Sequence, residues 1–271
     1  MTAEPTTTAP AKPRSRRFWT PRKRDWFLRI GTLVSFLGLW QWYGNTVNKV
    51  LLATPTAIAY AVWELFVKKN EILPAAWTTL SALLLGFTLS AVFGVVIGLA
   101  MGRIRLIQRM LDPYVSFFYA VPSIVFVPLV LAWVGLGIQL RVVLAVMAAV
   151  FPVIINTMVG VRQVPAEYTE VGSTFCASSG QTMRTIVLPY ALPFIFVGLR
   201  QAMLQSFVMV VVAEMLVAIT GLGGLMIVYS NFFKTARLFV PLLLIMALSM
   251  LLTTLLRRLG ERLAPWGKAD Q

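Results

Sequence analysis

Residues 78–101 read TTLSALLLGFTLSAVFGVVIGLAM and contain no charged side chain. A helix rises about 1.5 Å per residue, so a run of this length can cross a hydrocarbon core of about 30 Å. Within and just after it, small residues stand at every fourth position: Gly86, Ser90, Gly94, Gly98 and Gly102. Four residues advance a helix by about 400°, so these positions share one face. The stretch predicts a membrane-spanning helix with a tight helix–helix interface.

Similar apolar stretches occur along most of the chain. The predicted spans are 27–46, 78–101, 115–136, 138–161, 191–219 and 238–256. The composition agrees, with 58% hydrophobic and 13% charged residues and a mean hydropathy of +0.80. Soluble domains average about 45–50% apolar and about 25% charged residues. We therefore expect an all-α integral membrane protein with six transmembrane helices.

The basic residues predict the orientation of these spans. The net charge of +14 would suggest nucleic acid on a solvated surface, but this apolar chain has little such surface, so no nucleic-acid partner is expected. With six alternating spans, most Lys and Arg residues fall on one side: in the N-terminal tail, in the segments after the second and fourth spans, and at the C-terminus. That bias predicts cytoplasmic N and C termini in a multi-pass protein surrounded by membrane lipid.

The inventory of reactive residues excludes several kinds of chemistry. There is no histidine and a single cysteine, Cys176, so a metal site, a disulfide within the chain and redox chemistry are not expected. No GxxxxGK[ST] phosphate-binding loop occurs, so any ATP hydrolysis must come from another polypeptide. A membrane enzyme would also lack a convincing acid–base pair.

Two ionisable residues lie inside the fifth predicted span. Arg200 and Glu214 are therefore candidates for a role in a transport pathway or its gating. They are 14 residues apart, about 21 Å along a helix, and so cannot pair with each other. The structural alternatives are that Arg200 reaches toward the cytoplasm and that Glu214 caps a helix or pairs with a neighbouring span.

The segment 162–189 is much longer than a helical hairpin needs and is predicted to face the cytoplasm. It predicts two short helices, over 166–175 and from about 179 to 188, with Pro189 at the entry to the fifth span. Such a protrusion is suited to binding a cytoplasmic partner. The alternative is an element packed at the membrane interface.

This segment resembles the cytoplasmic signature of permease subunits of bacterial ABC importers. In that family Glu-Ala-Ala is followed after three residues by Gly, after nine more by Ile, and after one more by Leu-Pro. Here EVG stands at 170–172, Cys176 replaces the glycine, and Ile186, Leu188 and Pro189 keep every spacing. The stretches AVPS at 120–123, WVGLG at 133–137, FPVIINT at 151–157, GLR at 198–200 and VAEM at 212–215 are similar to those of the nitrate, sulfonate and taurine subfamily.

The resemblance covers roughly residues 51–266 and implies a type I ABC importer transmembrane domain in the bacterial inner membrane. It further implies that the loop is a coupling helix contacting the ATPase. The residues carried over by position are Glu170, Gly172, Cys176, Ala177, Ser178, Ser179, Gln181, Leu188 and Pro189. Because a cysteine adopts a left-handed turn only at some cost, the turn at 176 is expected to be reshaped or shifted toward Gly180.

The same resemblance implies the partners. They are a second copy of the chain, two cytoplasmic ATP-binding subunits that hold ATP and Mg²⁺, and an extracytoplasmic solute-binding protein; this chain itself binds no cofactor. The implied cargo is a small solute, by default an anion such as nitrate, a sulfonate or taurine, with a pyrimidine or thiamine precursor or a riboflavin-like vitamin as the alternative. The rival classes are a secondary transporter or channel without an ATPase, and a structural scaffold.

The expected organisation has four parts. Residues 1–26 form a disordered basic tail, and 27–72 hold the first span and an extracytoplasmic amphipathic helix lying on the membrane, marked by Ile58, Val62, Leu65 and Phe66. Residues 73–257 form the main transmembrane domain with its coupling loop at 162–189. Residues 258–271 form a cytoplasmic C-terminal tail.

Overall fold

The computed structural model describes residues 21–48, 50–217 and 220–268, and this part of the chain is helical without a strand. The helices are α1 (Pro21–Thr46), α2 (Pro55–Trp63), η1 (Glu64–Lys68), α3 (Ile72–Arg103), α4 (Arg105–Ala120), η2 (Ser123–Phe126), α5 (Val127–Val134), α6 (Ile138–Arg162), α7 (Ala166–Thr174), α8 (Ser179–Thr182), η3 (Met183–Val187), α9 (Leu188–Leu216), α10 (Gly221–Asn231), α11 (Thr235–Leu263) and η4 (Pro265–Lys268). The expected all-α class is confirmed.

Four helical stretches in the described residues are long and apolar enough to cross a membrane: α3, α6, the continuous run from α8 to α9, and α11. The pair formed by α4 with η2 and α5 qualifies only as one broken span. Helix α1 covers the first predicted span but is not among the qualifying helices. The count of six spans therefore stays a prediction.

The predicted third span, 115–136, is not the straight helix that its apolarity suggested. The chain bends by 89° between α4 and the η2–α5 segment. Val121 is extended, with φ −80° and ψ 127°, as expected of a residue that precedes a proline. Pro122 has no N–H and cannot continue the helix. Hydropathy reports only that such a segment is apolar, so the break was not predicted.

Helices α3 and α6 run in the same direction and are in close contact, and the predicted stripe of small residues lies between them. A Cβ atom added at Gly86 would lie 2.5 Å from the Cβ of Ala145, and one at Gly102 would lie 2.6 Å from that of Val161. Gly94 and Gly98 face Val153 and Thr157 in the same way, and Ser90 is fully buried. Both helices therefore contribute positions at a spacing of four residues to one interface.

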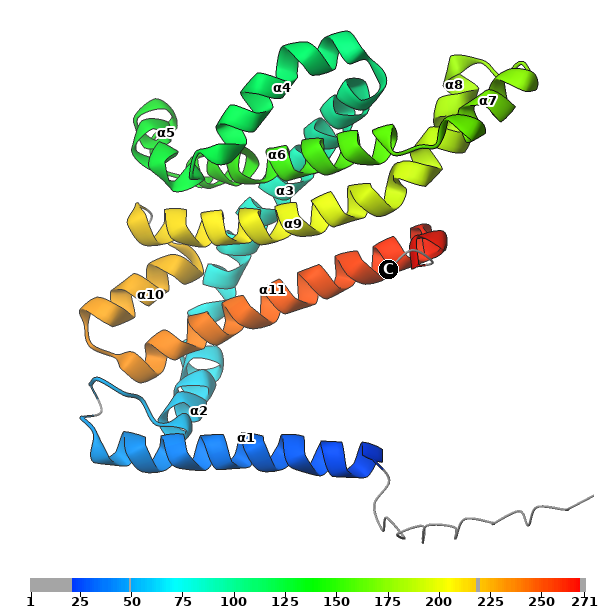
Figure 1. Cartoon of the computed structure of the whole chain (residues 1–271). Helices are drawn as coiled ribbons and strands as arrows, with labels where there is room; N and C mark the ends of the chain where they lie inside the picture. The colour runs from blue at the N-terminus through cyan, green and yellow to red at the C-terminus, as the bar shows by residue number, and fades with distance from the viewer. Residues whose placement is uncertain (1–20, 49, 218–219, 269–271) are drawn as a thin grey trace, which may run out of the picture.

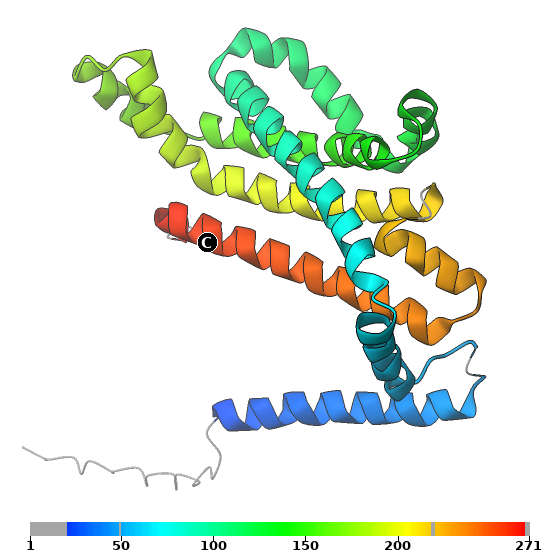
Figure 2. The same cartoon turned by 180° about the vertical axis from the view of Figure 1, so that it is seen from behind.

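Helix α9 packs antiparallel against α6 on another side. A Cβ atom at Gly160 would lie 2.7 Å from the Cβ of Phe194, and one at Gly198 would lie 2.9 Å from that of Asn156. The ribbons show α6 and α9 side by side in both views, with α3 crossing them (Figures 1 and 2). These three helices form the centre of the molecule, and α11 packs on the outer side of α9.

The segment predicted to lie on the membrane as an amphipathic helix is helical, but its apolar face packs inside the protein. Ile58 and Leu65 are buried, and Leu65 belongs to a cluster with Ile72 of α3, Tyr229 of α10 and Val240 of α11. Helix α3, which holds Ile72 at its first position, begins earlier than the predicted span 78–101. This face thus packs on α3, α10 and α11, and the expected position of the segment on the bilayer surface stays a prediction.

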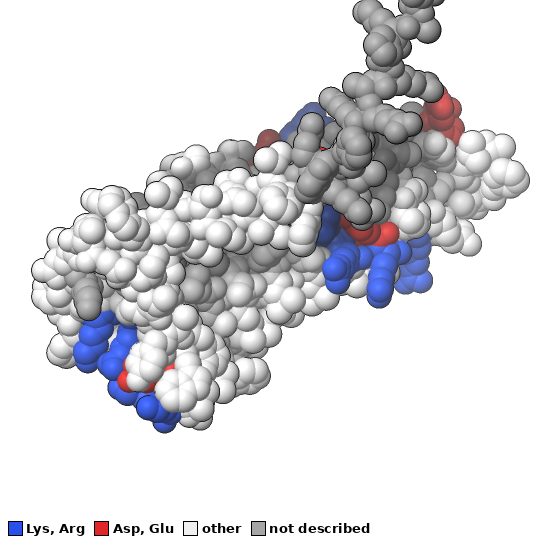
Figure 3. All heavy atoms as spheres, turned by 90° about the horizontal axis from the view of Figure 1, so that it is seen from below, with Lys and Arg blue, Asp and Glu red and all other residues white. Residues whose placement is uncertain are grey.

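The protruding helices and the described ends of the chain lie at the same end of the molecule. Helices α7 and α8 protrude at one end, where α1 begins and α11 ends (Figure 1). Residues 21–26 of the expected tail form the first turns of α1, and residues 258–263 extend α11, while 1–20 and 269–271 lie outside the described residues. On the face seen in Figure 3, charged side chains gather at the two ends and the surface between them is almost free of charge, as expected of a membrane band.

Candidate functional site

The protruding pair of helices has the form predicted for residues 162–189. Helix α7 runs from Ala166 to Thr174, and α8 begins at Ser179 after a tight turn. The chain then continues through η3 into α9 without an intervening loop. Leu188 and Pro189 follow η3 directly and form the first turn of α9. The protrusion is thus continuous with a membrane span.

Cys176 holds the turn between α7 and α8 in a left-handed conformation, with φ +53°. Its N–H donates to Ser173 O over 2.9 Å, and the next N–H, of Ala177, donates to Gly172 O over 2.9 Å. This pair of bonds is the Schellman arrangement that ends many helices, in which glycine usually takes the left-handed position. The turn is therefore neither reshaped nor shifted to Gly180, which lies within α8.

Three other residues carried over from the family pattern have local structural roles here. Ser178 caps α8 by accepting a bond from Gln181 N (3.3 Å), and the Gln181 side chain accepts one from Ser178 N (2.7 Å). Gly172 is buried where α7 meets the next helical segment, and a Cβ atom there would lie 3.1 Å from Ile186 Cδ1. These contacts fix the shape of the protrusion.

The outer side of the protrusion exposes apolar side chains. Tyr168, Val171 and Phe175 are exposed on α7 and at its end, with Phe175 82% exposed. Their spacing of three and four residues places them on one face of the helix. Glu170 and Ser179 are exposed beside them, and Ala177 is half-buried. Several exposed apolar side chains on one face form a patch, and such patches are typical of surfaces that bind a partner.

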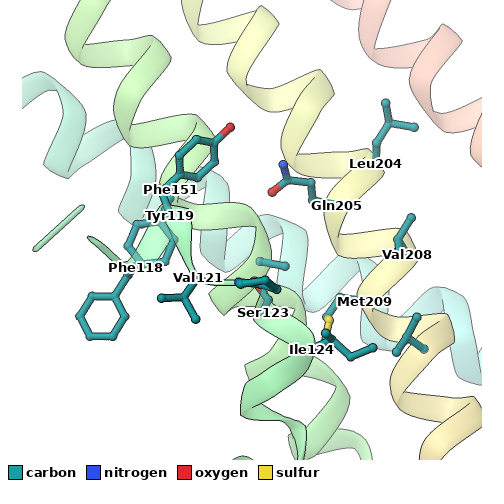
Figure 4. A pocket seen from close by; sticks show the side chains of 13 residues that line it. Phe118, Tyr119, Val121, Ser123, Ile124, Phe151, Leu204, Gln205, Val208 and Met209 are labelled. Atoms are coloured by element: carbon teal, nitrogen blue, oxygen red, sulfur yellow. The ribbon is translucent and has the colours of Figure 1, made fainter. Parts of the chain in front are cut away.

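A pocket of about 600 Å³ lies where α4 breaks away from α6 and α9. Its walls combine the aromatic rings of Phe118 and Phe151, stacked with centroids 6.1 Å apart, with the polar groups of Tyr119, Ser123 and Gln205. Gln205 points from α9 into this space (Figure 4). None of the residues lining it is charged. Sequence reasoning missed the pocket because it depends on the bend of the third span.

The two intramembrane charges of α9 have different surroundings. Arg200 is exposed on the surface of α9. Glu214 is fully buried and forms an ion pair with Arg141 of α6, with Nη1 3.0 Å from Oε1. Arg141 lies near the start of the fourth predicted span, and no sequence pattern singles it out. The structure buries it, because the first turn of α6 packs against the end of α9.

Charged and polar groups also join η1 and the start of α3 to α10 and α11. Arg237 of α11 donates two bonds to the Glu64 carboxylate, over 2.8 and 3.2 Å. The Tyr229 hydroxyl donates to Glu71 over 2.8 Å, and burial together with this carboxylate raises the pKa of Tyr229. Helix α10 was not predicted, because its sequence is too short and too rich in glycine to show a helical pattern.

Apolar spans, an uncharged pocket at a broken span and a protrusion continuous with a membrane span are features of a polytopic membrane protein of the transport class. Residues 90–266 match the family described as binding-protein-dependent transport system inner membrane component. The chain belongs to this family and is the permease subunit of an ABC importer, a multi-pass protein of the inner membrane. A secondary transporter or channel without an ATPase is correspondingly disfavoured.

Individual relatives carry different names. The taurine transport system permease protein TauC of Escherichia coli (strain K12) is 29% identical over 253 residues, which is 91% of this chain and 92% of TauC. The riboflavin transport system permease protein RibX of Chloroflexus aurantiacus is 29% identical over 238 residues, covering 87% and 88% of the two chains.

The fold is also found in a solved structure. An inward-facing structure of the MetNI methionine ABC transporter superposes with a TM-score of 0.55, covering 77% of this chain and 96% of that chain at 18% identity. At this identity the likeness shows the fold alone. It agrees with the expected type I importer membrane domain.

Proposed function

We propose that two copies of this chain form the membrane path of an importer driven by a separate ATPase. One ATP-binding subunit, with its ATP and Mg²⁺, docks on the protrusion of each copy, and this chain binds neither. An extracytoplasmic binding protein delivers a small solute at the opposite end. Both termini of the chain then lie in the cytoplasm.

The exposed apolar face of the protrusion supports this proposal most directly. Tyr168, Val171 and Phe175 stand in water on the free chain, and burying them in a groove of a partner would be favourable. The protrusion continues directly into α9, so a displacement of the docked partner would move that span as a rigid lever. Glu170 and Ser179 flank the apolar face and would contribute polar contacts at its edge.

The pocket at the broken span supports a path along the face formed by α4, α6 and α9. Non-helical backbone at membrane depth is tolerated only where it is buried in protein or lines a hydrated cavity. In a twofold assembly the pockets of the two copies would face each other across the interface. Gln205 and Ser123 would then hydrogen-bond the passing solute.

The substrate class has two candidates. The similarity to a taurine permease favours a small anion such as a sulfonate or nitrate. The similarity to a riboflavin permease, together with a pocket that is aromatic and uncharged, favours a flat vitamin-like compound or a pyrimidine precursor. Uptake of a radiolabelled sulfonate and of a radiolabelled flavin, compared between cells with and without this chain, separates the two.

Phe175→Asp tests the docking surface. The charge should prevent the ATPase subunit from copurifying with the permease, while the permease still elutes as a folded species in detergent. Phe233→Asp is the matched control, because Phe233 is 72% exposed after α10, at the end of the molecule opposite the protrusion. Copurification unaffected by Phe175→Asp would exclude this face as the docking site.

A further inference from the structure

Glu214 lies at the centre of a buried polar cluster that joins four helices. Its carboxylate accepts bonds from Arg141 Nη1 of α6 (3.0 Å), from the Thr79 hydroxyl of α3 (2.9 Å) and from the Gly223 N–H of α10 (3.0 Å). Thr79 Oγ1 in turn accepts a bond from the Leu222 N–H over 2.9 Å. The first turn of α10 is therefore held by Glu214 and Thr79 together.

The backbone of α10 is shaped to this carboxylate. Gly221 has φ +84°, and a Cβ atom there would collide with the Glu214 carboxylate. A Cβ atom at Gly223 would lie 2.5 Å from Val211 O, which is backbone and cannot move aside. Two glycines thus allow α10 to approach α9 closely enough for its N–H groups to reach Glu214.

The position of Glu214 does not suit contact with a passing solute. Its side chain is 0% exposed and that of Arg141 is 7% exposed. The pocket is lined from α9 by Met209 and Val212, and Glu214 is two residues beyond Val212, about 200° further round the helix. It therefore points away from the pocket, into the contact between α9 and α10.

We propose that Glu214 is a positioning residue that fastens α10, and with it the outer ends of α3 and α6, to the helix that carries the cytoplasmic protrusion. Helix α9 runs without a break from the protrusion to Glu214. A movement of the protrusion is thereby passed to α10 at the opposite end of the molecule (Figure 1). Transmission to and from an ATPase rests on the proposed function, whereas the fastening of α10 needs only the folded chain.

The fastening is tested by the distance between α9 and α10. Spin labels are placed at Val197→Cys and Ser230→Cys, both exposed sites, in a Cys176→Ser background. The parent should give one narrow distance. Thr79→Val and Glu214→Gln should each add a second population at another distance. The first variant removes the acceptor of the Leu222 N–H, and the second removes the negative charge of the acceptor of the Gly223 N–H.

The matched control is Thr78→Val, one residue earlier on α3, whose exposed hydroxyl bonds only to Pro74 O. It should keep the parent distance, as should Thr79→Ser, which retains the hydroxyl. If the Glu214→Gln variant does not insert into the membrane, the comparison of Thr79→Val with Thr79→Ser still tests whether α10 is fastened. The proposal is overturned if Thr79→Val gives the same single distance as Thr78→Val.

Transmission is tested in the complex with the ATPase and binding protein. Thr79→Val should retain basal ATP hydrolysis but lower the solute imported per ATP at least about fivefold, the scale of a typical coupling energy. Thr78→Val should leave that ratio unchanged. An unchanged ratio in Thr79→Val would overturn transmission through Glu214. Failure of any ATPase to bind would contradict the proposed function alone, since the spin-label distances do not involve it.

Discussion

Cys176 occupies a backbone position where a side chain is a disadvantage. Left-handed φ values bring the Cβ of an L-residue close to a carbonyl oxygen, which costs about 1–2 kcal/mol relative to glycine. The Schellman bonds from Cys176 N–H and Ala177 N–H hold the turn despite this cost. The neighbouring capping box of Ser178 and Gln181 fixes the start of α8 from the other side.

Cys176→Gly should therefore stabilise the protrusion. Part of the gain is offset because glycine has more conformational freedom in the unfolded chain, which leaves a net effect of about 0.5–1 kcal/mol. Amide hydrogen exchange in α7 and α8 should slow in this variant. Cys176→Val should speed it, since a β-branched residue tolerates the left-handed region poorly. Equal exchange in all three proteins would contradict the strained turn.

Ser178→Ala removes the cap of α8 and should destabilise the protrusion by about 1 kcal/mol. Hydrogen exchange of residues 179–187 should accelerate, while exchange in α6 stays unchanged. Ser173→Ala is the control, because its hydroxyl bonds only to Glu170 O within the exposed side of α7. Equal acceleration in both variants would show that the cap is not specific.

The interface between α3 and α6 is a property of two whole helices. At Gly98 the glycine stripe comes closest to the backbone of α6, because an added Cβ atom would lie 2.7 Å from Ile154 O, against 3.1 Å or more from a backbone oxygen at Gly86, Gly94 and Gly102. A backbone oxygen in a helix cannot move aside without breaking the helix. The small residues of α3 fit against a row of α6 side chains that is also spaced by multiples of four residues. This fit lets the two backbones approach closely inside a membrane, where no hydrophobic effect drives helices together.

Gly98→Leu should separate α3 from α6 and reduce the folded, monodisperse fraction in detergent size-exclusion chromatography. Overpacking a close interface costs about 1–3 kcal/mol or more. The control is Gly38→Leu in α1, where an added Cβ atom meets no other atom within 4 Å. Identical elution of the two variants would rule out the interface as a determinant of folding.

Much of this architecture could be predicted because its signals are local. The length of the segment 162–189 and its turn and proline signals predicted both helices of the protrusion. The stripe from Gly86 to Gly102 lies on one face because helical geometry places it there. The pair of Arg141 and Glu214 could not be predicted in this way. These residues are 73 positions apart, and no pattern within either span specifies its partner.

Seen as a whole, the molecule has one continuous mechanical element, which runs from α8 through η3 and α9. At one end it carries the turn at Cys176, and near the other it carries Glu214. The start of α1 and the end of α11 lie at the same end of the molecule as the protrusion. The basic residues predict that this end is cytoplasmic. The orientation of this element in the membrane decides where an ATPase can reach it.

The single cysteine of the chain makes this orientation directly testable. Cys176 is exposed in the turn of the protrusion, so a membrane-impermeant maleimide should label it in inverted membrane vesicles but not in intact spheroplasts. The chain is expressed without its partners, because a docked ATPase would shield the turn. Ser230→Cys in a Cys176→Gly background should give the opposite result, since Ser230 is exposed at the end of α10, on the other side. Labelling of Cys176 from outside would place the protrusion beyond the reach of a cytoplasmic ATPase and would overturn the proposed docking.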